Sequence, residues 1–164
     1  MKSFTKLVFT LYLIFLCIAA AGHNGKNHAE VNIEEPKESF EKKNLKSINQ
    51  EYVLKVKPIF ESKCFDCHGI NTEKPWYYVF PGIKQMINHD ISEAKEHMDM
   101  VNDFPFGGHG SPREDLEALK ETVENESMPP LQYKIMHWNS LLTKEEKKII
   151  SEWIGEGLKK LPNG

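Results

Sequence analysis

The chain has 164 residues, enough for one domain or for one domain with a tail. Its 21 Lys and Arg residues stand against 24 Asp and Glu residues, so the basic surplus typical of nucleic-acid-binding proteins is missing. A hydrophobic share of 40% excludes a polytopic membrane protein but supplies a small globular core, and three cysteines are too few for a disulfide scaffold.

The first 21 residues have the pattern of an export signal. Two lysines precede the apolar run 7–18, and three alanines follow it. This pattern is typical of a secretory signal peptide, which we expect to be cleaved after Ala21. The run is short for a membrane span, which needs about 20 residues. Cys17 raises the option of a lipidated N-terminus, but bulky Leu16 precedes it where a lipoprotein signal has a small residue. An uncleaved or lipidated N-terminus is kept as the alternative.

Residues 22–50 are polar, with Glu and Lys interspersed and few apolar side chains. Such a segment buries too little surface to offset its chain entropy, so we expect a flexible tether. The export signal predicts a periplasmic or otherwise exported protein, in which Cys64 and Cys67 are the two remaining cysteines.

Residues 51–161 show apolar stripes at helical spacing, which begin at Tyr52. Pro58 interrupts the first stripe and either begins a new helix or kinks a longer one. A second stripe covers 83–98, where Asp90 has the position of a helix cap and would divide the segment into two short helices.

Two capping boxes predict the later helices. Ser111 with Glu114 precedes an apolar face over 112–125, and Thr143 with Glu146 precedes the strongest amphipathic stripe of the chain. No segment shows sustained alternation of apolar and polar residues, so strands are not needed. We therefore expect an all-α domain with long loops.

The residues Cys64-Phe65-Asp66-Cys67-His68 form C-x-x-C-H, the attachment signature of c-type haem. Two thiols at this spacing can reach two vinyl groups on one edge of the porphyrin. The histidine that follows can then bind the iron. Attachment of haem c takes place after export, in agreement with the predicted signal peptide.

Three other uses of the cysteine pair compete with haem attachment. A thiol-disulfide exchanger also carries C-x-x-C, but usually on a fold richer in strands. A zinc site needs two further ligands, which His89, His97 or His109 could supply, but no second paired motif exists. A disulfide across two residues is geometrically poor.

The iron of c-type electron carriers is usually six-coordinate, commonly with His and Met. We expect Met128 as the distal ligand, because Pro129 and Pro130 stiffen its loop and 60 residues separate it from His68. His137 is the runner-up. Weaker rivals are His89, His97, His109 and Met136, whereas Met86 and Met98 lie on or beside an apolar stripe.

The stretch from Val53 to Trp153 resembles the small bacterial haem-binding domain family of the cytochrome c superfamily. The segments that carry this likeness are Val56-Lys57-Pro58-Ile59-Phe60, the C-x-x-C-H motif, Asn71-Thr72-Glu73-Lys74-Pro75-Trp76-Tyr77, Met128-Pro129-Pro130-Leu131-Gln132-Tyr133, His137 and Leu142-Thr143-Lys144-Glu145-Glu146. The resemblance implies cytochrome c-like helices wrapped around one covalent haem c. It implies Cys64 and Cys67 as attachment points and His68 as the proximal ligand, and Met128 matches the distal position.

These observations lead us to expect a mono-haem c-type cytochrome that passes single electrons between periplasmic redox partners and is not an enzyme. One rival is a haem enzyme such as a peroxidase with an open distal site, where His97, His109 or His137 could serve as acid and base. Another is a haem sensor or an electron-input module of a larger oxidoreductase. We expect no nucleic-acid partner, and a membrane only through an uncleaved or lipidated N-terminus.

Overall fold

The fold was obtained as a computed structural model, which describes residues 37–70 and 74–162. The expected signal peptide and residues 22–36 of the expected tether lie outside this range. Within it, no helix is long and apolar enough to cross a membrane.

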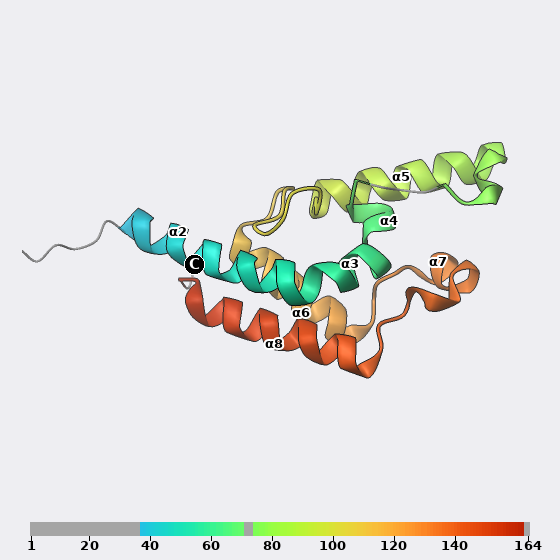
Figure 1. The fold of residues 1–164 in the computed structure, drawn as a ribbon. Coiled ribbons are helices and arrows are strands. Elements are labelled where there is room, and N and C mark those ends of the chain that lie inside the picture. Colours follow the sequence, from blue (N-terminus) through green and yellow to red (C-terminus); the bar gives the residue numbers. More distant parts are fainter. Residues whose placement is uncertain (1–36, 71–73, 163–164) are drawn as a thin grey trace, which may run out of the picture. The chain divides into compact units, whose positions relative to one another are not determined.

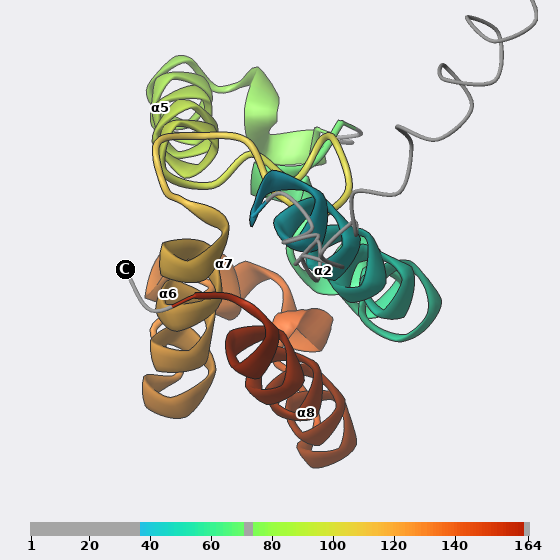
Figure 2. The same cartoon turned by 90° about the vertical axis from the view of Figure 1, so that its left-hand side faces the viewer.

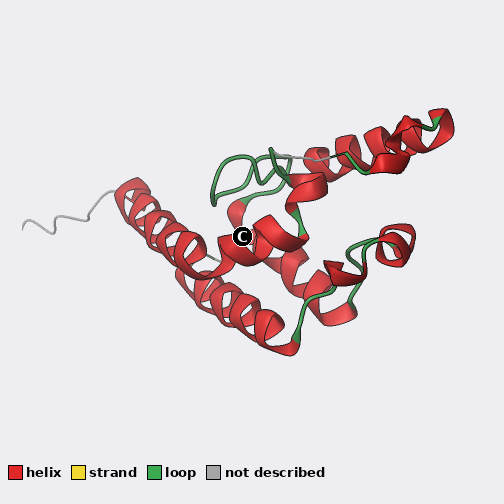
Figure 3. Ribbon diagram, turned by 45° about the vertical axis from the view of Figure 1, so that its right-hand side comes forward, coloured by secondary structure: helices red, strands yellow, loops and turns green. Residues whose placement is uncertain are grey.

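The described residues form helices joined by loops, and Figure 3 shows no strand among them. The only extended pairing in this part of the chain is an isolated bridge between Asp99 and Gly107. The all-α expectation is therefore confirmed. In chain order the elements are α2 (Lys37–Glu51), the π-helix η1 (Tyr52–Val56), α3 (Lys57–Lys63), α4 (Phe65–His68), the 3-10 helix η2 (Trp76–Val79), α5 (Pro81–His97), α6 (Pro112–Asn125), α7 (Leu131–Met136), the 3-10 helix η3 (Trp138–Ser140) and α8 (Lys144–Lys160).

Helix α2 lies where the sequence predicted a flexible tether, so the structure differs from that expectation over residues 37–50. The segment has few apolar residues, but Leu45 and Ile48 pack on the core. The backbone oxygen of Ile48 accepts a hydrogen bond from Trp153 Nε1 at 3.1 Å, and Asn44 Nδ2 donates to the Lys160 oxygen at 2.7 Å. Contacts with α8 thus order a segment whose composition alone favours disorder.

Helices α2, η1 and α3 follow one another without a break (Figure 1). Pro58 is the second residue of α3, a first-turn position that tolerates proline, and the helical path continues through it. The buried residues of this path contribute to an aromatic core with ring centroids 5.3 to 6.5 Å apart. The aromatic rings of this core are Tyr52, Phe60, Phe104, Phe106 and Trp153.

Helices α6 and α8 lie side by side in both views (Figure 1 and Figure 2) and pack through Leu116 and Gly157. Both predicted capping boxes are present. Ser111 Oγ accepts from the Glu114 N–H at 3.3 Å and Thr143 Oγ1 from the Glu146 N–H at 3.2 Å, while each glutamate accepts from its cap residue's N–H. These local signals place the starts of α6 and α8 as predicted.

Helix α5 is continuous from Pro81 to His97, so the expected division at Asp90 does not occur. Its stripe of Ile83, Ile87 and Ile91 is half-buried along the helix, and contacts with α4 and η2 hold it. The helix ends before Met98, whose backbone is extended. The next segment therefore turns back toward α4.

The contribution of α2 to stability can be measured with Ile48→Ala. The side chain is 1% exposed, so its truncation should lower the free energy of unfolding by about 2 to 5 kcal/mol. Urea unfolding followed by circular dichroism measures the change. The control Lys46→Ala, on an exposed position of the same helix, should stay within about 0.5 kcal/mol of the unchanged chain. Equal effects of the two variants would contradict the packing of α2.

Candidate functional site

The C-x-x-C-H motif forms one tight turn. Cys64 is the cap residue of α4, and its backbone oxygen accepts hydrogen bonds from the N–H groups of Cys67 at 3.2 Å and His68 at 3.0 Å. Both cysteines are free thiols, so the structure gives no support to a disulfide between them. The turn brings the two thiols and the imidazole to the wall of one cavity.

The ring of His68 is held in one orientation. Its Nδ1 lies 2.7 Å from the backbone oxygen of Met98. Because a carbonyl oxygen can only accept, Nδ1 carries the proton and Nε2 keeps a free lone pair. Burial lowers the pKa of His68, which favours the neutral imidazole that a metal ligand requires.

A second hydrogen bond joins the same two segments. The N–H of Met100 donates to the backbone oxygen of His68 at 2.9 Å. The segment that supplies both partners is closed by Asp99 and Gly107, which exchange two hydrogen bonds of 2.8 Å. His68 thus rests on a short loop that two backbone hydrogen bonds close.

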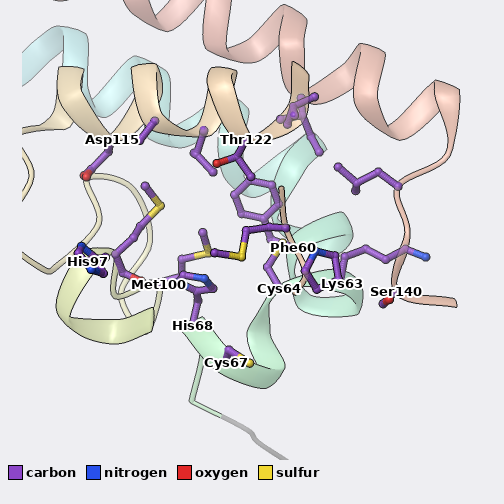
Figure 4. Close-up of a pocket in the computed structure, with 18 of the residues that line it drawn as sticks. Phe60, Lys63, Cys64, Cys67, His68, His97, Met100, Asp115, Thr122 and Ser140 are labelled. Atoms are coloured by element: carbon purple, nitrogen blue, oxygen red, sulfur yellow. Dashed lines mark hydrogen bonds between the residues drawn. The ribbon is translucent and has the colours of Figure 1, made fainter. Parts of the chain in front are cut away.

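The cavity has a volume of about 690 Å³, within the usual range for cofactor sites. Figure 4 shows Cys64, Cys67 and His68 on one wall, below residues of α6. Much of the remaining lining is apolar, with Phe60, Leu119, Val123, Leu142 and Ile150. These residues fit a haem, which is a planar apolar ring with an iron centre. The wall offers two thiols and a neutral imidazole beside an apolar interior. Cys64, Cys67 and His68 are therefore the residues that could hold a haem.

Met128 also lines the cavity, together with both prolines that follow it. Helix α6 ends at Asn125, and Glu126 takes a left-handed backbone conformation with φ of 55° that redirects the chain toward the site. The Met128 side chain is 52% exposed. The structure therefore places the expected distal residue at the cavity, from a different segment than His68.

Met100 lines the same cavity and is only 2% exposed, and Met98 is buried beside it. Sequence reasoning gave Met100 no role, and its position beyond the end of a helix carries no recognisable pattern. Figure 4 shows it next to His68, which its backbone hydrogen bond explains.

Helix α7 is fastened to the motif through Tyr133. Its hydroxyl donates a hydrogen bond to Asp66, one of the two residues between the cysteines. Its ring stacks on His137 at 3.9 Å, and Nε2 of His137 lies 3.4 Å from the hydroxyl of Tyr77. His137 thus lies between two tyrosines and does not line the cavity, unlike Met128. The role of Tyr133 could be read only from its place in the Met-Pro-Pro-x-x-Tyr segment.

The thiols are poor nucleophiles in this environment. Burial, with a smaller contribution from Cys67, raises the pKa of Cys64 to about 12, and burial raises the pKa of Cys67 as well. A thiol-disulfide exchanger needs the opposite shift. The part of the chain that the structure describes also has no group of three or more His, Cys, Asp or Glu residues able to hold a metal ion. Neither thiol exchange nor zinc binding gains support.

The remaining histidines divide into two groups. His89 lies on an exposed position of α5, away from the cavity lining, whereas His97 and His109 both line it. His97 and His109 contact each other, with His109 Nε2 3.0 Å from His97 Nδ1. Asp115, on the first turn of α6, completes this end of the cavity and was not foreseen from the sequence.

The packing of the motif turn can be tested at Gly69. A Cβ there would lie 2.5 Å from Cγ of Phe65, so Gly69→Ala should lower the free energy of unfolding by about 1 to 3 kcal/mol and reduce haem incorporation. Gly82→Ala is the matched control, because a Cβ at Gly82 meets no atom within 4 Å. That variant should be neutral or slightly stabilising. Urea unfolding compares the two, and equal losses would contradict the close contact between Gly69 and Phe65.

Comparison with known proteins agrees with the geometry. The chain is 30% identical over 98 residues to cytochrome c peroxidase Ccp of Escherichia coli (strain K12), and the match covers 58% of this chain and 21% of that protein. The chain thus spans about a fifth of the length of this relative. No solved structure matches the chain. The family model of the haem-binding domain matches residues 23–156. The chain therefore belongs to this family and is a haem-binding c-type cytochrome domain.

Proposed function

We propose that this chain is a mono-haem c-type cytochrome that carries single electrons between redox proteins. One observation carries the proposal: His68, with Nδ1 committed to Met98, shares a turn with two free thiols at the wall of an apolar cavity. Iron in a bound haem would supply one-electron redox chemistry. The residues of this chain supply the attachment, the axial ligation and the exclusion of water.

Covalent attachment assigns one role to each thiol. Cys64 and Cys67 would each hold one vinyl group of the haem as a thioether, formed by addition of the S–H bond across the vinyl double bond with no net oxidation. The turn of α4 places both cysteines and His68 at the wall of one cavity, and the hydrogen bond from His68 Nδ1 to Met98 increases the basicity of Nε2.

Met128 is proposed as the sixth ligand. Its loop is stiffened by Pro129 and Pro130 and is fastened at its ends, because Lys134 Nζ donates to the Glu126 oxygen at 2.8 Å and Tyr133 donates to Asp66. A loop already held in place loses little entropy when its sulfur binds iron. A thioether ligand stabilises the reduced state and raises the potential.

The proposed partners are redox proteins outside the cytoplasm. The expected signal peptide and the attachment of haem c after export both support this location. The segment 131–141, which includes the cavity-lining residues Tyr133, Ser140 and Leu141, also exposes large apolar side chains that can form the dry centre of a transient protein interface. These side chains are Leu131, Ile135, Trp138 and Leu141.

The distal assignment is tested with Met128→Ala, made in a host with cytochrome c maturation. The purified variant should keep a c-type pyridine haemochrome spectrum at one haem per chain, because Cys64, Cys67 and His68 are unchanged. It should lose the absorption band of Met-ligated ferric haem, and its midpoint potential should fall. Met136→Ala, at a half-exposed residue outside the cavity lining, is the control and should change neither property. An unchanged spectrum for the Met128 variant would refute the assignment.

A second candidate function is peroxide reduction, because the relative from Escherichia coli is named as a cytochrome c peroxidase. Our proposal predicts that iron stays six-coordinate in both redox states, since His68 and Met128 fill both axial positions. The wild-type protein should therefore show no peroxide turnover with a reduced electron donor, whereas Met128→Ala should gain measurable turnover through the vacated position. Absorption spectroscopy in the presence of peroxide measures the turnover of both proteins. Turnover by the wild-type protein would favour the peroxidase function.

A further inference from the structure

One end of the cavity is polar, and the proposed function does not account for it. His97 comes from the last residue of α5, His109 from the loop that follows, and Asp115 from the first turn of α6. The two imidazoles are in direct contact, with His109 Nε2 3.0 Å from His97 Nδ1. A proton shared between these nitrogens leaves one outer ring nitrogen on each histidine for another partner.

Asp115 is the unusual member of this group. It is 3% exposed, and its Oδ2 atom has no hydrogen-bond partner. The loop closes tightly over it, since a Cβ on Gly110 would lie 2.4 Å from Oδ1. A buried carboxyl oxygen without a hydrogen-bond partner is costly and rare, and Oδ2 is therefore available to a polar group of a bound ligand.

Charged groups of the loop and of α6 lie around Asp115. Burial raises its pKa to about 6, Glu114 acts in the same direction, and His109 lowers it. The loop also carries Asp99 and Asp103, which bond to the Val101 N–H and to Lys57. On α6, Arg113 is bonded to Glu117 and to backbone oxygens near the end of α8. The side of α8 that packs on α6 is apolar, with Ile150, Ile154 and Gly157 buried there.

The shape of a haem assigns an occupant to this end. A haem carries its vinyl groups on one edge and its two propionates toward the opposite edge. Figure 4 shows His97 and Asp115 on the side of His68 away from Cys64. A haem held by its vinyl groups at Cys64 and Cys67 would have His97 and Asp115 available to its propionates.

We propose that His97, His109 and Asp115 form a propionate-binding site, in which the Asp115 carboxyl group donates its proton in a hydrogen bond to a haem propionate. The inference rests on the proposed function, because it requires a haem attached at Cys64 and Cys67. The histidine pair supplies a ring N–H donor to the propionates, and a protonated Asp115 avoids the repulsion between two carboxylates.

This arrangement links the electron to a proton. When a protein donor reduces the site, the Asp115 carboxylate would take up one proton from solvent, so the charge of the site would be unchanged. On oxidation Asp115 would release this proton. An ionised Asp115 stabilises the ferric state, so the midpoint potential should fall as pH rises through the pKa of Asp115. A neighbouring propionate raises this pKa further, which places the window at and above about pH 6.

The experiment is a spectroelectrochemical titration of the holoprotein from about pH 5 to about pH 9. The wild-type midpoint potential should fall with pH over this range, and Asp115→Asn should lose the dependence. The control is Glu121→Gln, which removes the same charge from an exposed position of the same helix and should keep the dependence. A pH dependence that Asp115→Asn leaves intact would overturn the inference.

A second variant covers the case in which Asp115→Asn does not fold. His109→Gln removes a group that lowers the pKa of Asp115, so the inflection should move to higher pH, and an unmoved inflection would also overturn the inference. The pyridine haemochrome spectrum distinguishes a failure of the proposed function from a failure of the propionate site. Absence of c-type haem in the wild-type protein would refute the proposed function together with this site. Covalent haem with a pH-independent potential would refute the propionate site alone.

Discussion

The hydrogen bond from His68 Nδ1 to the Met98 oxygen is the constraint on which the site depends. It can form because α5 ends at His97, which leaves the Met98 carbonyl free of the helix and directed at the motif turn. The N–H of Met100 donates a hydrogen bond to the backbone oxygen of His68, so the same loop segment holds both the ring and the backbone of His68. One tautomer results, which leaves the lone pair of Nε2 available at a residue that lines the cavity.

The two sides of the cavity differ in how firmly they are built. On the histidine side, the turn of α4 rests on the aromatic core, and Gly69 allows Phe65 to pack directly against its backbone. On the other side, Met128 is half-exposed and is held by the fastening of its neighbours to Asp66 and Glu126. The histidine side is therefore the more firmly held of the two.

Local signals in the sequence predicted what local interactions determine. The capping boxes at Ser111 and Thr143 placed the starts of two helices, and the C-x-x-C-H motif indicated the residues of the cavity wall. Helix α2 was not predicted, because its order comes from contacts with α8 about a hundred residues later. Asp115 was missed for a similar reason, since its burial results from the loop that closes over it.

The π-helical turn η1 has a consequence for the direction in which the motif faces. In an α-helix, four residues exceed a full turn by about 40°, so side chains spaced by four drift steadily around the axis. The buried residues Ile48, Tyr52, Val56 and Phe60 keep this spacing over three intervals. The wider turn of a π-helix rotates the other way and cancels part of the drift. The π-helical turn thus corrects the angular position of the residues that follow it around the helix axis. Cys64, four residues after Phe60, therefore reaches the cavity on the side of the axis that the core residues define.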